Sequence, residues 1–354
     1  MSSPGRPKSS YRSALHGGLP VTTSSSVKHV IADSGSLGWS GWLRRWETLL
    51  VAVLVLVIVF GSISLKEFLD PNNLADSTFN FSEKALIALA MALLIIVREI
   101  DISVSGILAV SSVAMGYANT LGVPAAGLAV IGIAVGALCG SLNGLLVTRF
   151  GIPSIVVTIG TMSLFRGIAL VVLGDQAFTN YPEALGEWGQ GYVFGFIPRE
   201  FVILLVFAAL FALLLHGTTY GRRIYAIGSN PIAARFSGIP VDRYRLALFI
   251  LAGTMAGLAA VLLTGRIGST RPNIALGWEL EAITMVILGG VSIAGGAGTI
   301  GGVLLAVFTL GMVTYGLGLA NVPGIIMTIV IGALLLVTIT VPVLLRFRGA
   351  TARR

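Results

Sequence analysis

The sequence predicts an all-α membrane protein with about ten transmembrane helices and an inverted internal repeat. Of the 354 residues, 55% are hydrophobic and only 11% are charged, whereas soluble domains carry about 25% charged residues. Long apolar runs recur along most of the chain, and a run of this kind crosses a bilayer as a helix. The alternating segments of about ten residues that build a membrane β-barrel do not occur in the sequence.

The chain divides into a membrane domain between two tails. Residues 1–45 are rich in Ser, Gly and basic residues, which predicts a disordered basic tail. This tail is not a signal peptide, because the first apolar run starts too late, near Leu49. Residues 46–346 form the predicted transmembrane domain, and residues 347–354 form a second tail.

Ten apolar segments are the expected spans, of which the second, third and eighth are short enough to be partly buried or broken. An even number of spans places both termini on one side, and the Lys and Arg residues of the tails place that side in the cytoplasm. The loop near residues 174–198 has acids but no Lys or Arg, which fits the opposite side. The spans lie roughly at residues 46–63, 83–98, 103–119, 123–148, 153–173, 200–216, 246–265, 279–291, 299–317 and 323–345.

The loop Thr218–Arg245 is basic and turn-rich, with Asp242 as its single acid. An excess of Lys and Arg in a short loop marks the cytoplasmic side. The loop has room for a short amphipathic helix at Pro231–Ser237, closed by Gly238 and Pro240. A helix in a cytoplasmic loop of a multi-span protein indicates a partner that docks there.

Two pairs of segments indicate the internal repeat. Residues 152–159 resemble residues 322–329, and residues 101–109 have a fainter echo in residues 281–289. In both pairs the offset is five spans, an odd number, so the copies have opposite orientations, as in many transporters. Chance similarity between apolar segments is the alternative.

Four glycines share one face of the fourth span, and a face without side chains lets a partner helix come close in lipid. They are Gly132, Gly136, Gly140 and Gly144. The alternative is that glycine is simply frequent, with 45 in the chain. Asn143 lies at the inner end of this face and needs a polar partner or water.

The segment Val97–Gly106 places Arg98, Glu99 and Asp101 between two apolar runs. Ionisable groups at membrane depth indicate a functional site by default. The alternative is a short cytoplasmic turn with solvated charges, in which the Asp101 carboxylate caps the next span. In both cases that span carries hydroxyl groups able to line a polar path, from Ser103, Ser105 and Ser111.

The segment Gly277–Thr284 carries Glu279 and Glu281 at the outer start of the eighth span. It is either a mouth for a polar solute or a helix start whose carboxylates meet the positive end of the helix dipole. Arg166, within the fifth span, pairs with an acid, lines a wet cavity or snorkels to the interface. The predicted translocation pathway comprises Asp101, Ser103, Ser105, Asn143, Glu281 and Thr284.

Several site classes are excluded by the sequence. The glycine-rich segment Gly289–Gly302 lacks the G-K-[ST] end of a phosphate loop, and it predicts a tight turn or a broken helix instead. The single cysteine, Cys139, and the three histidines form no metal-binding pattern, so we expect no metal, no cofactor and no catalytic residue. The net charge of +8 lies largely in the tails and the basic loop, and it does not indicate nucleic-acid binding.

Three motifs resemble one family: residues 99–106 (EIDISVSG), 225–239 (YAIGSNPIAARFSGI) and 277–302. The chain resembles the membrane permease subunits of bacterial sugar ABC importers, of the ribose, rhamnose and autoinducer-2 type, over about Phe81–Leu345. The resemblance implies a multi-pass protein of the bacterial cytoplasmic (inner) membrane that translocates a sugar. It is not an enzyme, because a separate partner ATPase hydrolyses the ATP.

The resemblance also implies the partners of the chain. They are two copies of the ATPase subunit, a second permease copy or a paralogue, and a periplasmic or lipid-anchored sugar-binding protein. The basic loop is the segment that docks on the ATPase, with Arg235 reaching an acidic rim. The implied contact residues are Gly228, Asn230, Ala233, Ala234, Ser237 and Gly238.

The first motif departs from the common pattern of the family. Arg98 and Glu99 precede Ile100, where many members have two glycines, and Ser105 follows Val104, where many members have glycine. This departure resembles the rhamnose-type branch. It leaves the sugar open among rhamnose-like, ribose-like and autoinducer-2-like solutes.

An ion-coupled secondary transporter of a small polar solute is the alternative function. Such a transporter normally shows ionisable residues within its spans, and the fourth, sixth, seventh, ninth and tenth spans have essentially none in their centres. An intramembrane enzyme is disfavoured because the spans carry no catalytic or metal-binding constellation. The sequence does not decide between a homodimer and a heterodimer.

Overall fold

The computed structural model describes residues 46–334, 336 and 340, which are mostly helical. The tails predicted at residues 1–45 and 347–354 lie outside the described residues. Six segments of the described part are long and apolar enough to cross a membrane. They are Pro71–Ile96, Ala125–Phe150, Ser154–Leu173, Arg199–Gly217, Val241–Ile267 and Ile300–Leu319.

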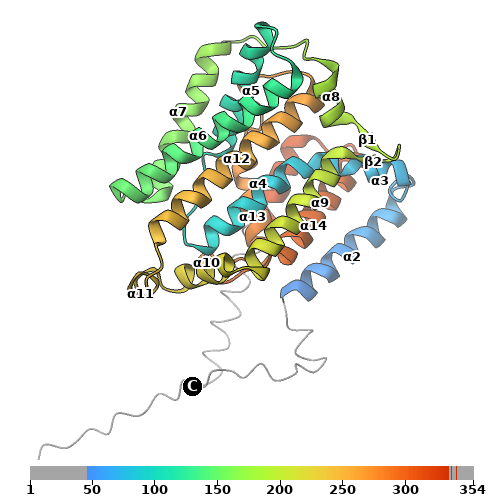
Figure 1. The fold of residues 1–354 in the computed structure, drawn as a ribbon. Coiled ribbons are helices and arrows are strands. Elements are labelled where there is room, and N and C mark those ends of the chain that lie inside the picture. The colour runs from blue at the N-terminus through green and yellow to red at the C-terminus, as the bar shows by residue number, and fades with distance from the viewer. Residues whose placement is uncertain (1–45, 335, 337–339, 341–354) are drawn as a thin grey trace, which may run out of the picture. The chain divides into compact units, whose positions relative to one another are not determined.

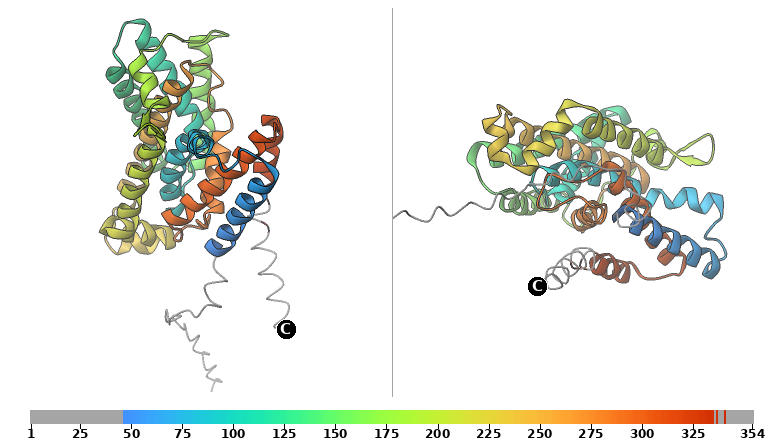
Figure 2. Two further views of the ribbon diagram at one scale, coloured as in Figure 1. Left: turned by 90° about the vertical axis from the view of Figure 1, so that its right-hand side faces the viewer. Right: turned by 90° about the horizontal axis from the view of Figure 1, so that it is seen from below.

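A helix occupies each of the ten ranges expected as spans, as far as those ranges are described. The all-α membrane class is therefore confirmed, whereas by length and composition six of the segments qualify as spans. The first helix, α2 (Trp46–Ser64), and the last, Gly324–Leu334, are shorter apolar helices. α2 packs along α14 (Ile300–Leu319) at the side of the bundle (Figure 2).

The central helix is α4 (Phe79–Ile96), which is buried along nearly its whole length (Figure 1). A helix enclosed by other helices needs no polar face, which explains its unbroken apolar sequence. It follows α3 (Pro71–Ser77), which was not predicted from the sequence. The Asp70 carboxylate caps α3 by accepting hydrogen bonds from two backbone N–H groups at 2.9 and 3.1 Å.

The closest helix crossing joins α6 (Ala125–Phe150) to α12 (Val241–Ile267). A Cβ atom at Gly136 would lie 2.3 Å from the carbonyl oxygen of Gly253, and a Cβ at Gly253 would lie 2.2 Å from that of Gly136. Gly140 stands equally close to the backbone of Phe249. The glycine face of α6 therefore lies directly against the backbone of α12.

Two short helices begin or end within the bundle. α5 (Val104–Thr120) follows the α4–α5 break, residues 97–103. α13 (Trp278–Leu288) ends at a glycine-rich turn that leads into α14. Four glycines of this turn have a positive φ angle, which an L side chain rarely adopts: Gly290, Gly295, Gly296 and Gly298. The turn expected from the sequence is thus present.

One end of the bundle carries α8 (Glu183–Gln190) and a small antiparallel hairpin of β1 (Tyr192–Val193) and β2 (Ile197–Pro198). Tyr192 pairs with Pro198 across the hairpin. These elements follow α7 (Ser154–Leu173) and precede α9 (Arg199–Ala212).

The opposite end of α9 carries the basic loop. A π-helical turn, η1 (Leu213–Gly217), leads into α10 (Thr219–Ser229) and α11 (Pro231–Phe236). Figure 1 shows α10 and α11 at the end of the bundle away from the hairpin. The sequence predicted α11 but not α10.

Candidate functional site

The α10–α11 segment turns sharply at Asn230, which ends one helix and begins the next. Its side-chain oxygen Oδ1 accepts hydrogen bonds at 3.0 Å from the backbone N–H groups of Ile232 and Ala233, as a helix N-cap does. Pro231 occupies the first helical position, where its missing N–H costs nothing. Gly238, with φ 81°, ends the helix. The short helix predicted from these residues is confirmed.

The outward face of α11 is apolar. The side chains of Ile232 and Phe236 are 69% and 90% exposed, and four residues apart they share one helix face. Ala233 and Ser237 are also exposed. The sequence did not single out Ile232 and Phe236, although their spacing in a predicted amphipathic helix was the available signal.

Two of the residues expected to contact a partner, Ala234 and Gly228, are buried against this chain, and a third, Arg235, forms an ion pair within the loop. Ala234 is only 4% exposed. Gly228 is buried, and a Cβ atom there would lie 1.9 Å from the carbonyl oxygen of Ile96. The Arg235 guanidinium pairs with Asp242 at 2.5 Å, and its side chain remains exposed. The small size of Ala234 and Gly228 therefore serves packing within this chain, whereas the predicted contact of Arg235 with a partner stays a prediction.

The α10–α11 segment is fastened to the α4–α5 break. Nε of Arg98 donates to the carbonyl oxygen of Gly228 at 2.5 Å, and Nη2 donates to that of Ser229 at 2.6 Å. The neighbouring Glu99 forms an ion pair of 2.9 Å with Arg245 on α12. The charges of this motif are thus engaged with the basic loop.

A buried polar cluster follows at the start of α5. Oδ1 of Asp101 accepts hydrogen bonds from the backbone N–H of Ser103 at 2.8 Å and from its hydroxyl at 2.6 Å. Nδ2 of Asn143 donates to the same hydroxyl at 2.7 Å, so Ser103 is the polar partner that Asn143 needed. The N-cap of α5 is Ser103, and Asp101 binds Ser103 itself rather than the free N–H groups of the first helical turn. Asp101 is also fully buried, so the solvated turn with Asp101 as the cap is not what the structure shows.

Several polar atoms around this cluster have no hydrogen-bond partner within the described part of the chain. They are Oδ2 of Asp101, Oδ1 of Asn143 and the hydroxyl oxygens of Ser105 and Ser111. Buried polar groups without partners cost free energy, so this cluster is an unusual feature of the interior.

A polar cavity of about 510 Å³ lies near the other end of α4. Nζ of Lys84 forms an ion pair with Glu281 at 2.5 Å and lies 5.1 Å from the ring centre of Trp278. Thr284 is buried and donates to the carbonyl of Leu280, outside this lining. We name this cavity the outer cavity, after the side on which Glu281 is expected from the sequence, and its lining includes Asn80, Lys84, Arg266, Trp278, Glu281 and Thr314.

A charged cluster lies beside the outer cavity and was missed from the sequence. Nε of Arg266 pairs with Glu83 at 2.7 Å and lies 4.0 Å from Glu200. Both carboxylates are fully buried. The three residues come from α12, α4 and α9, so no local pattern in the sequence connects them.

Arg166 lines a second polar cavity of about 610 Å³ together with Arg271 and Asp175. Its Nη1 donates to the carbonyl oxygens of Pro272 and Ile274 at 2.9 and 2.7 Å. Of the three alternatives for Arg166, the structure shows the one in which its side chain lines a cavity. Its guanidinium also binds the loop before α13.

The chain matches a protein family described as the branched-chain amino acid transport system / permease component, over residues 73–339. The chain belongs to this permease family. It is 34% identical to the autoinducer 2 import system permease protein LsrD of Photorhabdus luminescens over 300 residues, 83% of this chain and 90% of the relative. The proteins of the same name from Yersinia enterocolitica and Yersinia pseudotuberculosis are 37% and 35% identical over the same shares. No solved structure matches the chain.

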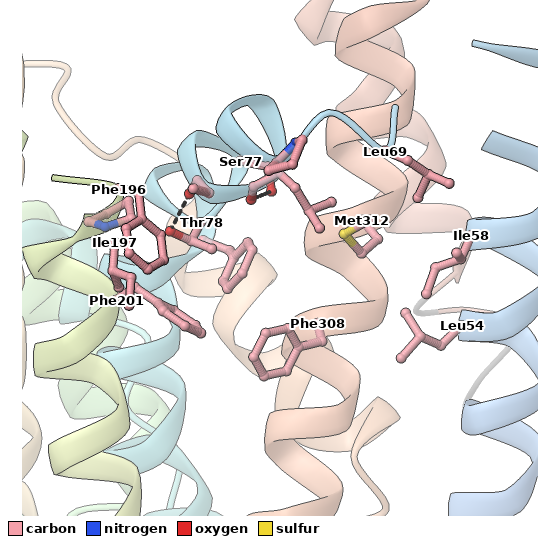
Figure 3. A pocket seen from close by; sticks show the side chains of 15 residues that line it. Leu54, Ile58, Leu69, Ser77, Thr78, Phe196, Ile197, Phe201, Phe308 and Met312 are labelled. Carbon is pink, nitrogen blue, oxygen red and sulfur yellow. Dashed lines mark hydrogen bonds between the residues drawn. The ribbon is translucent and has the colours of Figure 1, made fainter. Parts of the chain in front are cut away.

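One further cavity of this permease is unsuited to a polar solute. It has a volume of about 530 Å³ and lies between α2, α3, α9 and α14. Its lining is almost wholly apolar, as Figure 3 shows for Leu54, Phe201 and Phe308. A hydroxylated solute would lose its hydrogen bonds to water there without replacement. This apolar cavity is therefore not a binding site for such a solute.

Proposed function

We propose that this permease is the membrane subunit of an ATP-binding-cassette importer for a sugar-like solute of the rhamnose, ribose or autoinducer-2 kind. The relatives are named autoinducer 2 import system permease proteins, which supports import of such a solute. The observation that carries the proposal is α11, a short helix that holds Ile232 and Phe236 outward at the end of the bundle. The chain itself performs no covalent chemistry.

The docking contact is a helix laid in a groove of the ATPase subunit. This mode uses apolar anchors spaced along one helix face, and an exposed phenylalanine surrounded by smaller side chains suits the centre of such a contact. Ala234 and Gly228 support the contact from behind, because they pack α11 and α10 against the rest of the permease. The ATPase is present as two copies, one under each permease subunit.

The permease crosses the bacterial inner membrane ten times, with both termini and the α10–α11 segment in the cytoplasm. The helices found in all ten expected ranges support this topology. The inverted repeat is supported by Pro153 and Pro323, each of which immediately precedes a helix and accepts hydrogen bonds from its first turn. Residues 1–45 and 347–354 are the cytoplasmic tails of this arrangement.

The proposed solute path contains two polar sites, the outer cavity and the buried polar cluster at Asp101. The outer cavity offers an aromatic ring, Trp278, beside the Lys84–Glu281 ion pair, and cavities of this size suit a small ligand. The buried polar cluster at Asp101 offers unsatisfied oxygens toward the cytoplasmic side. A second permease copy or a paralogue completes the path, and a periplasmic or lipid-anchored binding protein delivers the solute to its outer end.

An ion-coupled secondary transporter is favoured by one specific observation, the charged cluster of Glu83, Arg266 and Glu200. Buried carboxylates of this kind carry protons in many ion-coupled transporters. The family to which the chain belongs weighs against this function. The cluster then has a structural role beside the outer cavity.

Reconstitution tests the proposed function. The tagged permease is expressed with the ATPase and binding-protein genes of its own chromosomal neighbourhood, and uptake of labelled autoinducer 2, rhamnose and ribose is measured in proteoliposomes. We expect uptake of one of them that needs internal ATP and is abolished by vanadate. Uptake that is insensitive to vanadate but is abolished by a protonophore would support the ion-coupled alternative.

A further inference from the structure

We propose that Arg98 couples the α10–α11 segment to the solute path, so that movement of the segment under the ATPase is transmitted to the α4–α5 break. The inference rests on the proposed function and adds a residue and a route to it. Arg98 is a positioning residue, because its guanidinium bonds to the protein backbone and acts through the residues that follow it.

Arg98 binds the segment at the point where its two helices meet. Its two hydrogen bonds end on the carbonyl oxygens of Gly228 and Ser229, the last residues of α10. Carbonyl groups at a helix C-terminus lack partners within the helix and carry partial negative charge. A guanidinium with two donors matches them, and charged donors form stronger hydrogen bonds than neutral ones.

The backbone at the same place is packed without spare room. A Cβ atom at Gly228 would lie 1.9 Å from the carbonyl oxygen of Ile96 and 2.5 Å from the backbone nitrogen of Gly296. That nitrogen donates to the same Ile96 oxygen at 2.9 Å. Three backbone segments are therefore in direct contact, and α10 is unable to shift without moving the end of α4.

The conformation of Arg98 is itself unusual. Its φ angle is 68°, in the left-handed region that residues other than glycine rarely adopt. This conformation ends α4, because the backbone N–H groups of Arg98 and Glu99 donate to the carbonyl oxygens of Ile95 and Leu94, each at 2.9 Å. The helix end thus fixes the backbone of Arg98, and its side chain ties this rigid helix end to α10.

A movement of the backbone at Arg98 would reach the proposed solute path within a few residues. Glu99, next in the chain, is paired with Arg245 on α12. Asp101 then begins the buried polar cluster with Ser103 and Asn143. A change in backbone direction at Arg98 therefore displaces the Asp101 carboxylate and the start of α5 together.

The test compares docking, hydrolysis and transport in one reconstituted complex. Arg98→Ala and Arg98→Gly both remove the guanidinium, and the glycine variant also relieves the left-handed strain. We expect both variants to co-purify with the ATPase at the wild-type ratio and to hydrolyse ATP. Uptake of the transported solute should fall at least tenfold, and the solute-loaded binding protein should no longer stimulate hydrolysis. Arg98→Lys, which keeps one donor and the charge, should recover part of both.

Arg222→Ala is the matched control, because Arg222 is an exposed arginine on α10, the helix that Arg98 binds, and it should leave uptake and stimulation near wild type. The inference is overturned if Arg98→Ala and Arg98→Gly transport within twofold of wild type. It is also overturned if both variants lose the ATPase and thermal stability in parallel with uptake, because Arg98 is then only a structural cap. A wild-type permease that binds no ATPase at all would instead refute the proposed function.

Discussion

The Nζ atom of Lys84 lies 2.5 Å from Oε2 of Glu281, although the two residues are 197 positions apart in the sequence. The pair joins α4 to α13 at the wall of the outer cavity, next to Trp278. Paired charges at membrane depth are found mainly where they line a wet path. The Lys84–Glu281 ion pair therefore supports the proposal that the outer cavity lies on the solute path.

Substitutions of Lys84 and Glu281 distinguish a role of their ion pair in transport from a role in stability. Lys84→Met leaves Glu281 without its cation, which should cost about 1–3 kcal/mol of stability and reduce uptake. In the double variant Lys84→Met/Glu281→Gln no unpaired charge remains, so thermal stability should return while uptake stays low. Recovery of uptake in the double variant would show that the pair is structural and that the solute does not use its charges.

The charged cluster predicts a large loss of stability for one substitution. Arg266→Met removes the cation between the buried carboxylates of Glu83 and Glu200, and breaking a buried ion pair costs about 3–5 kcal/mol. Thermal unfolding in detergent measures the effect. Arg199→Met breaks the exposed pair with Glu187 and should change stability by about 1 kcal/mol or less. Equal effects at the two sites would contradict the assigned role of burial.

The glycine contact between α6 and α12 predicts where a bulky side chain is tolerated. Gly140→Leu places atoms where the backbone of Phe249 already lies, so we expect poor yield and a destabilisation of about 1–3 kcal/mol or more. Gly160→Leu, on α7, meets open space and should purify normally. Normal stability of Gly140→Leu would mean that the two helices are not in close contact in the membrane.

The proposed topology is tested with single cysteines in a Cys139→Ser background. Ser237, at the end of α11, and Glu183, in α8, are both exposed, and Figure 1 shows these two helices at opposite ends of the bundle. A membrane-impermeant thiol reagent added to intact cells, with the outer membrane permeabilised, should label Glu183→Cys but not Ser237→Cys. Labelling of Ser237→Cys from outside would overturn the orientation drawn from the positive charges.

Local signals in the sequence were sufficient for some elements and not for others. α11 was predicted because the amphipathic stretch from Pro231 to Ser237 is closed by Gly238 and Pro240, which are local signals. The burial of Ala234 was not, because a single helical turn does not reveal which face packs against the rest of the chain. The Glu83–Arg266 pair joins residues far apart in sequence, and such a contact depends on how helices pack.

The same distinction applies to the motif at the α4–α5 break. The sequence left a functional site and a solvated turn as alternatives for these charges, and the burial of Glu99 and Asp101 excludes the solvated turn. The contacts of Arg98 with α10 were beyond prediction, because α10 itself was not expected. The helix begins at its N-cap Thr218 and ends at Asn230, and its packing against Ile96 and Gly296 at Gly228 joins segments that are far apart in sequence.

Co-purification of the ATPase subunit with two matched phenylalanine variants tests the central proposal most directly. Phe236 on α11 and Phe194 in the hairpin are 90% and 87% exposed and lie at opposite ends of α9. Asp in place of an apolar anchor buries an unpaired charge in the contact, which is costly. Phe236→Asp should lose the ATPase and ATP-dependent uptake, while Phe194→Asp should retain the ATPase at the wild-type ratio. Retention of the ATPase by Phe236→Asp, or equal loss in both variants, would contradict docking through α11.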